Sequence, residues 1–120
     1  MYRIKNSGLG DITVAKEVVE TLAGLAAMDC YGLVGMVAQD IQTGITSILG
    51  RESIRKGVSV NNTEDGLIVD VYVIVGYGVN IREVAYNVMQ KVTYFLRTNA
   101  GLVVAAVNVN VKGVRVLGEN

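Results

Sequence analysis

The strongest constraint on the fold is a regular alternation of side chains near the C-terminus. One series of positions in the segment 102–111 is apolar, and it consists of Val103, Ala105, Val107, Val109 and Val111. Asn108 and Asn110 stand between members of that series, and a similar period of two runs through 57–61 and 67–75. Because successive side chains of a strand point to opposite faces, the pattern predicts a sheet with one apolar face and one more polar face. The polar face is expected either to be solvated or to pair with another subunit.

Two other segments have helical spacing. The apolar stripe in residues 14–28 is Val14, Val18, Leu22, Leu25 and Ala26, and the stripe in residues 80–98 is Ile81, Val84, Val88, Val92 and Phe95. Both patterns predict amphipathic helices that pack on a core. Thr13 or Asp11 is expected to cap the first helix, and Asn80 and Glu83 have capping-box spacing at the second. A third, short helix is predicted over 39–50.

These elements predict an α+β fold, a two-layer sandwich of a mixed β-sheet with two main helices and one short helix on one face. Asp65-Gly66 between the strand segments predicts a hairpin, because glycine accepts positive φ. A chain of 120 residues, 51% of them hydrophobic, is expected to form one domain, 1–120. Aligning Ile12 with Ile81 also aligns Gly32 with Gly101, which indicates a weak internal repeat of helix, glycine and strand. Chance similarity between two apolar helices is the alternative.

Composition argues against several classes of function. The chain has no histidine, so it cannot build a Ser-His-Asp site or a zinc site of cysteine and histidine ligands. We therefore expect no enzyme activity, catalytic residue, metal or cofactor. Eleven basic and eleven acidic side chains cancel, and nucleic acid is not an expected partner. The basic cluster of Arg51, Arg55 and Lys56 is interpreted as a solvated face. The alternative, which would give the cluster a function, is contact with an anionic partner.

Cysteine usage and hydropathy indicate the compartment. A single cysteine, Cys30, fits a reducing cytoplasm and is expected to be a small core residue. Residues 1–6 are too polar for a signal peptide, and the apolar stretches are too short to span a membrane. We expect a cytoplasmic protein without direct membrane insertion, or one peripheral to the membrane through a partner.

The segment "VIVGYGVNIREV" (73–84) resembles a phosphate-binding loop, since a strand runs into Gly76 and Gly78 and then into a helix. The dinucleotide fingerprint requires a third glycine and a distant acidic residue. Ile81 stands at the glycine position, and residues 97–99 contain no acid. A strand-to-helix turn is the favoured interpretation, with Asn80 as the cap. Anion or partner contact through Gly76, Gly78 and Asn80 is the alternative.

The ordered segments resemble the alkaline shock protein family of bacterial envelope stress response proteins, and the chain looks like a short, compact member. The matching stretches are "ITVAKEVVETLAGLAA", "GLVGM", "LGRESIRKGVSV", "VGYGVNIREVAYNVMQKV" and "GLVVAAVNVNVKGV". The family often has a histidine where this chain has Asn110, so any role of that histidine is absent here.

The resemblance implies a non-enzymatic cytoplasmic scaffold or adaptor linked to cell-envelope stress or homeostasis. Members self-associate and gather at the membrane through anchored protein partners. No catalytic residues are established for the family, so the resemblance transfers none to this chain. The alternative is a ligand- or anion-binding accessory subunit of an enzyme, such as a neighbouring dihydroxyacetone- or fatty-acid-kinase-like protein.

Overall fold

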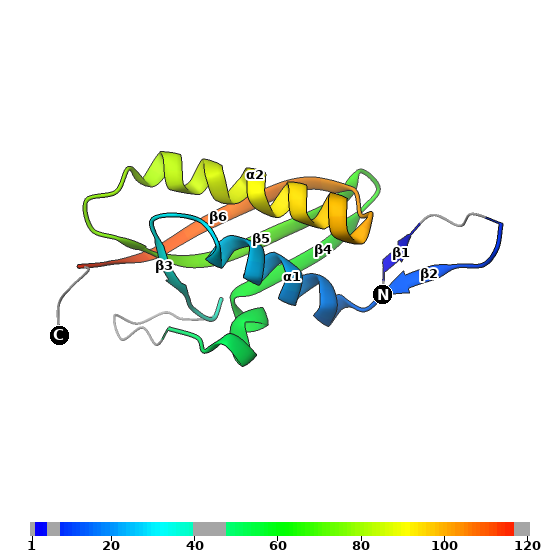
Figure 1. Cartoon of the computed structure of the whole chain (residues 1–120), viewed down its shortest axis with the longest axis horizontal. Coiled ribbons are helices and arrows are strands. Elements are labelled where there is room, and N and C mark those ends of the chain that lie inside the picture. The colour runs from blue at the N-terminus through cyan, green and yellow to red at the C-terminus, as the bar shows by residue number, and fades with distance from the viewer. Residues whose placement is uncertain (1, 5–7, 40–47, 117–120) are drawn as a thin grey trace.

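The computed structural model describes residues 2–4, 8–39 and 48–116. Its elements in chain order are β1 (Tyr2–Ile4), β2 (Ile12–Val14), α1 (Lys16–Met28), β3 (Leu33–Met36), the 3-10 helix η1 (Arg51–Gly57), β4 (Val58–Thr63), β5 (Gly66–Gly76), α2 (Ile81–Ala100) and β6 (Val104–Arg115). The two long helices cover one face of a sheet built around β5 (Figure 1). This arrangement confirms the predicted α+β class.

Strand β5 organises the main sheet. β6 runs parallel to β5 along almost its whole length, whereas β3 and β4 are antiparallel to it. Val73 pairs with both Met36 of β3 and Val111 of β6, so these two strands lie on opposite edges of β5. Val71 likewise pairs with Val58 of β4 and Val109 of β6. β3 and β4 therefore share one edge of β5, and the sheet is mixed, as predicted.

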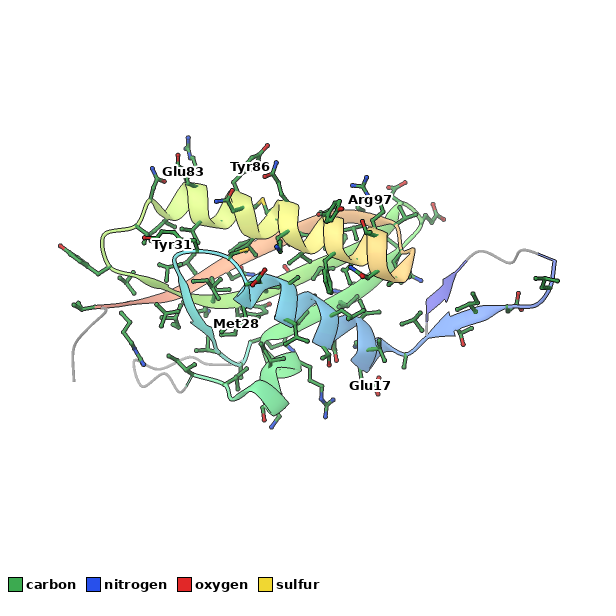
Figure 2. All side chains as sticks on the ribbon, viewed as in Figure 1. Glu17, Met28, Tyr31, Glu83, Tyr86 and Arg97 are labelled. Carbon is green, nitrogen blue, oxygen red and sulfur yellow. The ribbon has the colours of Figure 1, made fainter. Side chains whose placement is uncertain are left out.

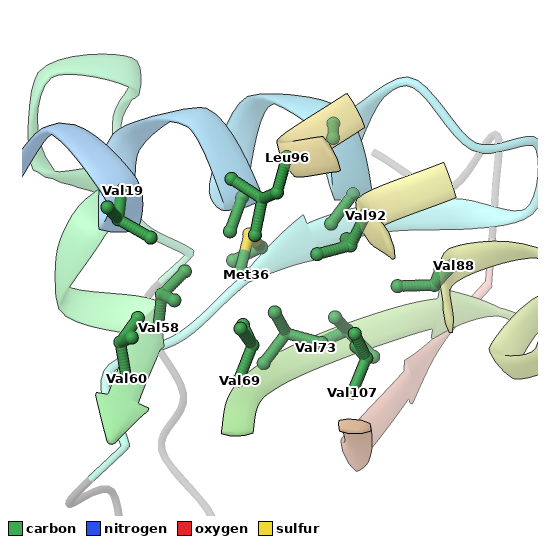
Figure 3. Close-up of a cluster of buried hydrophobic side chains, with 14 of the residues drawn as sticks. Val19, Met36, Val58, Val60, Val69, Val73, Val88, Val92, Leu96 and Val107 are labelled. Carbon is green, nitrogen blue, oxygen red and sulfur yellow. The ribbon is translucent and has the colours of Figure 1, made fainter. Parts of the chain in front are cut away.

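The core lies between the helices and the apolar face of the sheet. Alternate residues of β5, including Val69, Val71 and Val73, are fully buried. Val69 and Val73 lie beneath Val88 and Val92 of α2 (Figure 3). Burying one such side chain contributes about 1.5–3 kcal/mol, so this layer of valines is a principal source of stability. The core also receives side chains from α1, β3, η1, β4 and β6.

The two helices begin differently. The side chain of Asn80 caps α2, because its Oδ1 accepts a hydrogen bond from the backbone N–H of Glu83 at 3.1 Å. Gly101 ends α2 in the left-handed region at φ 67°. At α1 the N-cap residue is Ala15, and no side chain caps it. The expected cap by Thr13 or Asp11 is wrong, because β2 extends to the helix and Thr13 pairs with Arg3 of β1.

The predicted short helix falls at a different place in the described residues. Residues 40–47, most of the segment expected to be helical, lie outside the described part of the chain, and residues 48–50 are not helical. The short helix that the structure contains is η1, which begins at Arg51. Ile54 anchors it: the side chain is buried and packs against α1 at Gly24.

Strand β6 differs from its predicted pattern. Leu67 pairs with Val104, but the next residue of β5, Ile68, pairs with Ala106, so Ala105 is an extra residue. The prediction that Val103 and Ala105 face the core with Val107 is wrong. Val103 is 69% exposed and Val107 only 7%. A bulge reverses the facing of the residues before it, and period-two counting cannot detect it.

Two hairpins complete the fold. The Asp-Gly signal is confirmed, since β4 and β5 join through a tight turn in which the Thr63 hydroxyl donates to the Gly66 carbonyl at 2.7 Å. The N-terminal hairpin of β1 and β2 was not predicted. It projects from one end of the molecule (Figure 1), and Ile12 in β2 is exposed.

Candidate functional site

The loop between β5 and α2 is held by its own backbone. Gly76 N–H donates to the Gly32 carbonyl at 3.0 Å, and Tyr77 N–H donates to the Arg115 carbonyl at 2.8 Å. Gly78 has φ of 91°, in the region where glycine avoids strain. The loop thus joins three segments, and two of its amides are engaged within the protein.

The N-terminus of α2, which follows this loop, is already stabilised by groups of the protein itself. Asn80 satisfies one of the free amides, and Glu83 places a carboxylate in the first turn of α2. A carboxylate there interacts favourably with the helix dipole and opposes an incoming anion. The arrangement is that of a capped strand-to-helix turn. Anion contact at Gly76, Gly78 and Asn80 stays a prediction.

The basic cluster lies elsewhere. Arg51, Arg55 and Lys56 all belong to η1, which packs on α1 and β4, while the Gly76–Asn80 loop follows the C-terminal end of β5 (Figure 1). The structure therefore does not bring the two predicted contact groups together. Arg55 and Lys56 are exposed. Partner contact through η1 also stays a prediction.

A polar surface lies on the side of the sheet opposite the two long helices. We call it the open face, and it comprises the side chains of Ser59, Asn61, Asp70, Tyr72, Asn108 and Asn110, none of which is fully buried. Asn108 Nδ2 donates to Asp70 Oδ1 at 3.0 Å, and Asn110 Nδ2 donates to the Val71 carbonyl at 3.3 Å. The predicted polar face is confirmed, and Asn110, where the family often has histidine, lies on it.

The surroundings of Cys30 argue against an activated thiol. Its Sγ donates weakly to the Ala26 carbonyl at 3.8 Å, and the side chain is half-buried against the core. Burial raises the pKa of the Cys30 thiol, and this effect outweighs the opposing influence of Lys91. Lys91 Nζ is instead paired with Asp29 Oδ2 at 3.0 Å, which links the end of α1 to α2. Over residues 2–4, 8–39 and 48–116, no group of three or more cysteine, aspartate or glutamate side chains could hold a metal ion.

Tyrosines mark the helical side of the molecule. Tyr86 and Tyr94 lie on α2 and are 60% and 64% exposed. Tyr31 is exposed in the turn after α1, and Figure 2 shows it together with Tyr86. Beside Tyr94 is a shallow groove, which is lined by Met89, Gln90, Thr93, Tyr94 and Arg97. The sequence pattern did not identify Val103, Val114 and Val116, which are exposed on β6 and its flanks.

A family model for the alkaline shock protein 23 family, described as having a cell envelope-related function, matches residues 4–116. The chain belongs to this family. The matched range includes α1, the whole main sheet and α2, so the open face and the capped loop both lie within it. The resemblance inferred from the sequence is confirmed.

Relatives in this alkaline shock protein family cover the chain almost end to end. The uncharacterized protein YloU of Bacillus subtilis (strain 168) is 45% identical over 108 residues, which is 89% of this chain and 90% of that protein. The uncharacterized protein Spy1614 of Streptococcus pyogenes serotype M6 is 38% identical over 116 residues, 96% of each chain. The uncharacterized protein YqhY of Bacillus subtilis (strain 168) is 32% identical over 92% of this chain and 82% of that protein. No solved structure matches.

No helix in the described part of the chain is both long enough and apolar enough to cross a bilayer.

Proposed function

We propose that this member of the alkaline shock protein family is a non-enzymatic cytoplasmic adaptor in cell-envelope homeostasis. It acts by associating with copies of itself and by binding a membrane-anchored protein. The family's cell envelope-related description supports the process. The observation that carries the adaptor role is the open face, a broad sheet surface of amide, carboxylate, hydroxyl and phenol groups.

Self-association is supported by the chemistry of the open face. Asparagine side chains each carry two donor hydrogens and an acceptor oxygen, so one amide can bond within the protein and across an interface at once. Asn108 and Asn110 use Nδ2 internally, and no described residue donates to either Oδ1. Interfaces between separately folded subunits ordinarily contain direct hydrogen bonds between polar groups of this kind.

Partner binding is supported by the exposed surface of α2. Tyrosine, methionine and arginine are enriched at protein interfaces, and tyrosine is a frequent hot-spot residue. The groove beside Tyr94 contains Met89 and Arg97, and Tyr86 lies on the same helix. We assign this surface to the membrane-anchored partner, which leaves the sheet available for self-association.

Sedimentation velocity of the pure protein across the micromolar range tests self-association. We expect the sedimentation coefficient to rise with concentration as monomers combine. A strict monomer throughout that range would contradict the self-associating adaptor. Thermal melting at each concentration provides a second readout, because a protein stabilised by its own copies has a concentration-dependent Tm.

Binding to membrane vesicles from the native host tests the anchored partner. We expect the protein to sediment with untreated vesicles and not with vesicles whose proteins have been digested, because the receptor is a protein. The double variant Tyr86→Ala/Tyr94→Ala should bind more weakly than Tyr31→Ala, which removes a tyrosine 89% exposed in the turn after α1. Equal binding to digested vesicles would indicate a lipid receptor and contradict the proposal.

A further inference from the structure

Strand β6 has an outer edge that no described strand covers. β6 spans Val104–Arg115, twelve residues, and β5 is its sole strand partner within residues 2–4, 8–39 and 48–116. A strand paired on one side presents the backbone N–H and C=O groups of its other side in a row. Natural proteins protect long edges of this kind or use them for pairing.

The middle of this edge lacks the usual protection. Residues 106–111 read Ala-Val-Asn-Val-Asn-Val, which contains no charge and no proline. Register shifts occur on either side, at Leu67/Ile68 and at Val73/Ile74 of β5, so the stretch between them is regular. A neutral, regular stretch rich in β-branched residues is suited to accept another strand.

We propose that the occupant is β6 of a second copy, paired antiparallel about a two-fold axis at Val109. This inference rests on the self-association proposed above and identifies the surface that performs it. The axis is perpendicular to the sheet, so the two open faces join into one continuous surface. Asn108 of each copy then lies opposite Asn110 of the other. Their unused amide hydrogens and Oδ1 atoms are placed to form cross-strand hydrogen bonds.

The charges of β6 select a second copy in this orientation. Lys112 and Arg115 are the two charged residues of the strand, and both lie near its C-terminal end. A parallel pair in register would place each cation beside its equivalent, which is unfavourable. The antiparallel pair instead places Lys112 and Arg115 of each copy near the uncharged N-terminal end of the other copy's β6.

The double variant Asn108→Lys/Asn110→Lys tests the pairing. It places lysine opposite lysine twice across the two-fold axis, while in a single chain both side chains remain on the open face. The matched control is Ser59→Lys/Asn61→Lys, which adds the same charge with the same spacing to the open face on β4, at the other edge of β5. We expect the dissociation constant of the dimer to rise on the order of 100-fold or more in the β6 variant and to change little in the control. Thermal melting verifies that both variants fold.

Hydrogen exchange of the wild-type protein provides a measurement that needs no variant. Backbone amides in the 104–113 peptide should exchange more slowly at high concentration than at high dilution, while those of β4 should not respond. Self-association that persists in the β6 variant, or is lost only in the β4 control, would overturn this interface and leave the adaptor function standing. A wild-type protein that is monomeric throughout would overturn both.

Discussion

Gly32 lies directly against Val84, and this contact sets how closely the turn after α1 approaches α2. A Cβ atom at Gly32 would be 2.7 Å from Val84 Cγ2, which is well inside van der Waals contact. The same glycine has φ of 89°, and its carbonyl accepts the Gly76 N–H. One residue thus joins the α1–β3 turn, the start of α2 and the end of β5, and a side chain at this position cannot be accommodated without movement.

Gly32→Ala is therefore expected to lower the free energy of unfolding by about 2–5 kcal/mol. About 1–2 kcal/mol comes from the left-handed backbone and the remainder from overpacking against Val84. Gly78→Ala is the matched control, since φ is 91° there but nothing lies within 4 Å of an added Cβ. Gly78→Ala should therefore lower the free energy of unfolding only by the contribution of the left-handed backbone. Urea unfolding measures both, and equal losses would show that the Val84 contact is unimportant.

Asn80→Ala is expected to cost about 1 kcal/mol, because it removes the acceptor for the Glu83 amide at the start of α2. Asn80→Asp should retain most of the stability. The control is Asn87→Ala, at an exposed position inside the same helix, where alanine's higher propensity should make the protein slightly more stable. Thermal unfolding monitored by circular dichroism distinguishes them. No loss in Asn80→Ala would argue against the side-chain cap.

Because of the bulge at Ala105, two nearby valines are expected to differ in how much stability the same substitution costs. Val107→Thr places a hydroxyl in the core and should cost about 1–3 kcal/mol. Val103→Thr changes an exposed side chain and should stay within about 0.5 kcal/mol of the wild type. Chemical denaturation of the two variants, at a concentration where the protein is monomeric, measures the difference. A larger loss at Val103 would mean that the uninterrupted alternation is correct after all.

Cys30 is expected to react slowly with iodoacetamide in the folded protein. The thiolate is the reactive form, and burial raises the pKa of this thiol, so the thiolate forms only at higher pH than in the unfolded chain. The pH at which the rate of reaction rises should therefore be higher in the folded protein than in the unfolded chain. Lys91→Met should slow the reaction further, because Lys91 is the neighbour that lowers the pKa of Cys30. A folded protein that reacts as fast as its urea-unfolded form would contradict this.

Phosphate and nucleotides are expected to leave the Tm unchanged. Gly76 and Tyr77 already use their amides, and Glu83 places a negative charge at the start of α2. Differential scanning fluorimetry with phosphate, acyl phosphates and nucleotides checks this. A reproducible rise in Tm that Gly78→Val abolishes, with folding retained, would instead support the anion-binding accessory subunit.

The sequence by itself determined the elements whose signals are local. The Asp65-Gly66 turn, the Asn80 cap and the Gly101 stop each depend on residues within a few positions of one another. The alternation in 67–75 likewise identified the two faces of β5, and with them the open face. Backbone dihedrals, capping bonds and side-chain period are properties of short segments, so a sequence pattern can predict them.

The tertiary structure decided the features that depend on which segments meet. In the pairing of β6 with β5, Ala105 is an extra residue, and Val103 therefore faces the surface. Thr13 pairs with Arg3 of β1 and so does not cap α1. The order of strands leaves the long edge of β6 uncovered in the described chain. A strand's own residues do not specify its neighbour on either side, because every backbone offers the same donors and acceptors. The surface that we assign to self-association therefore appeared only once the sheet was assembled.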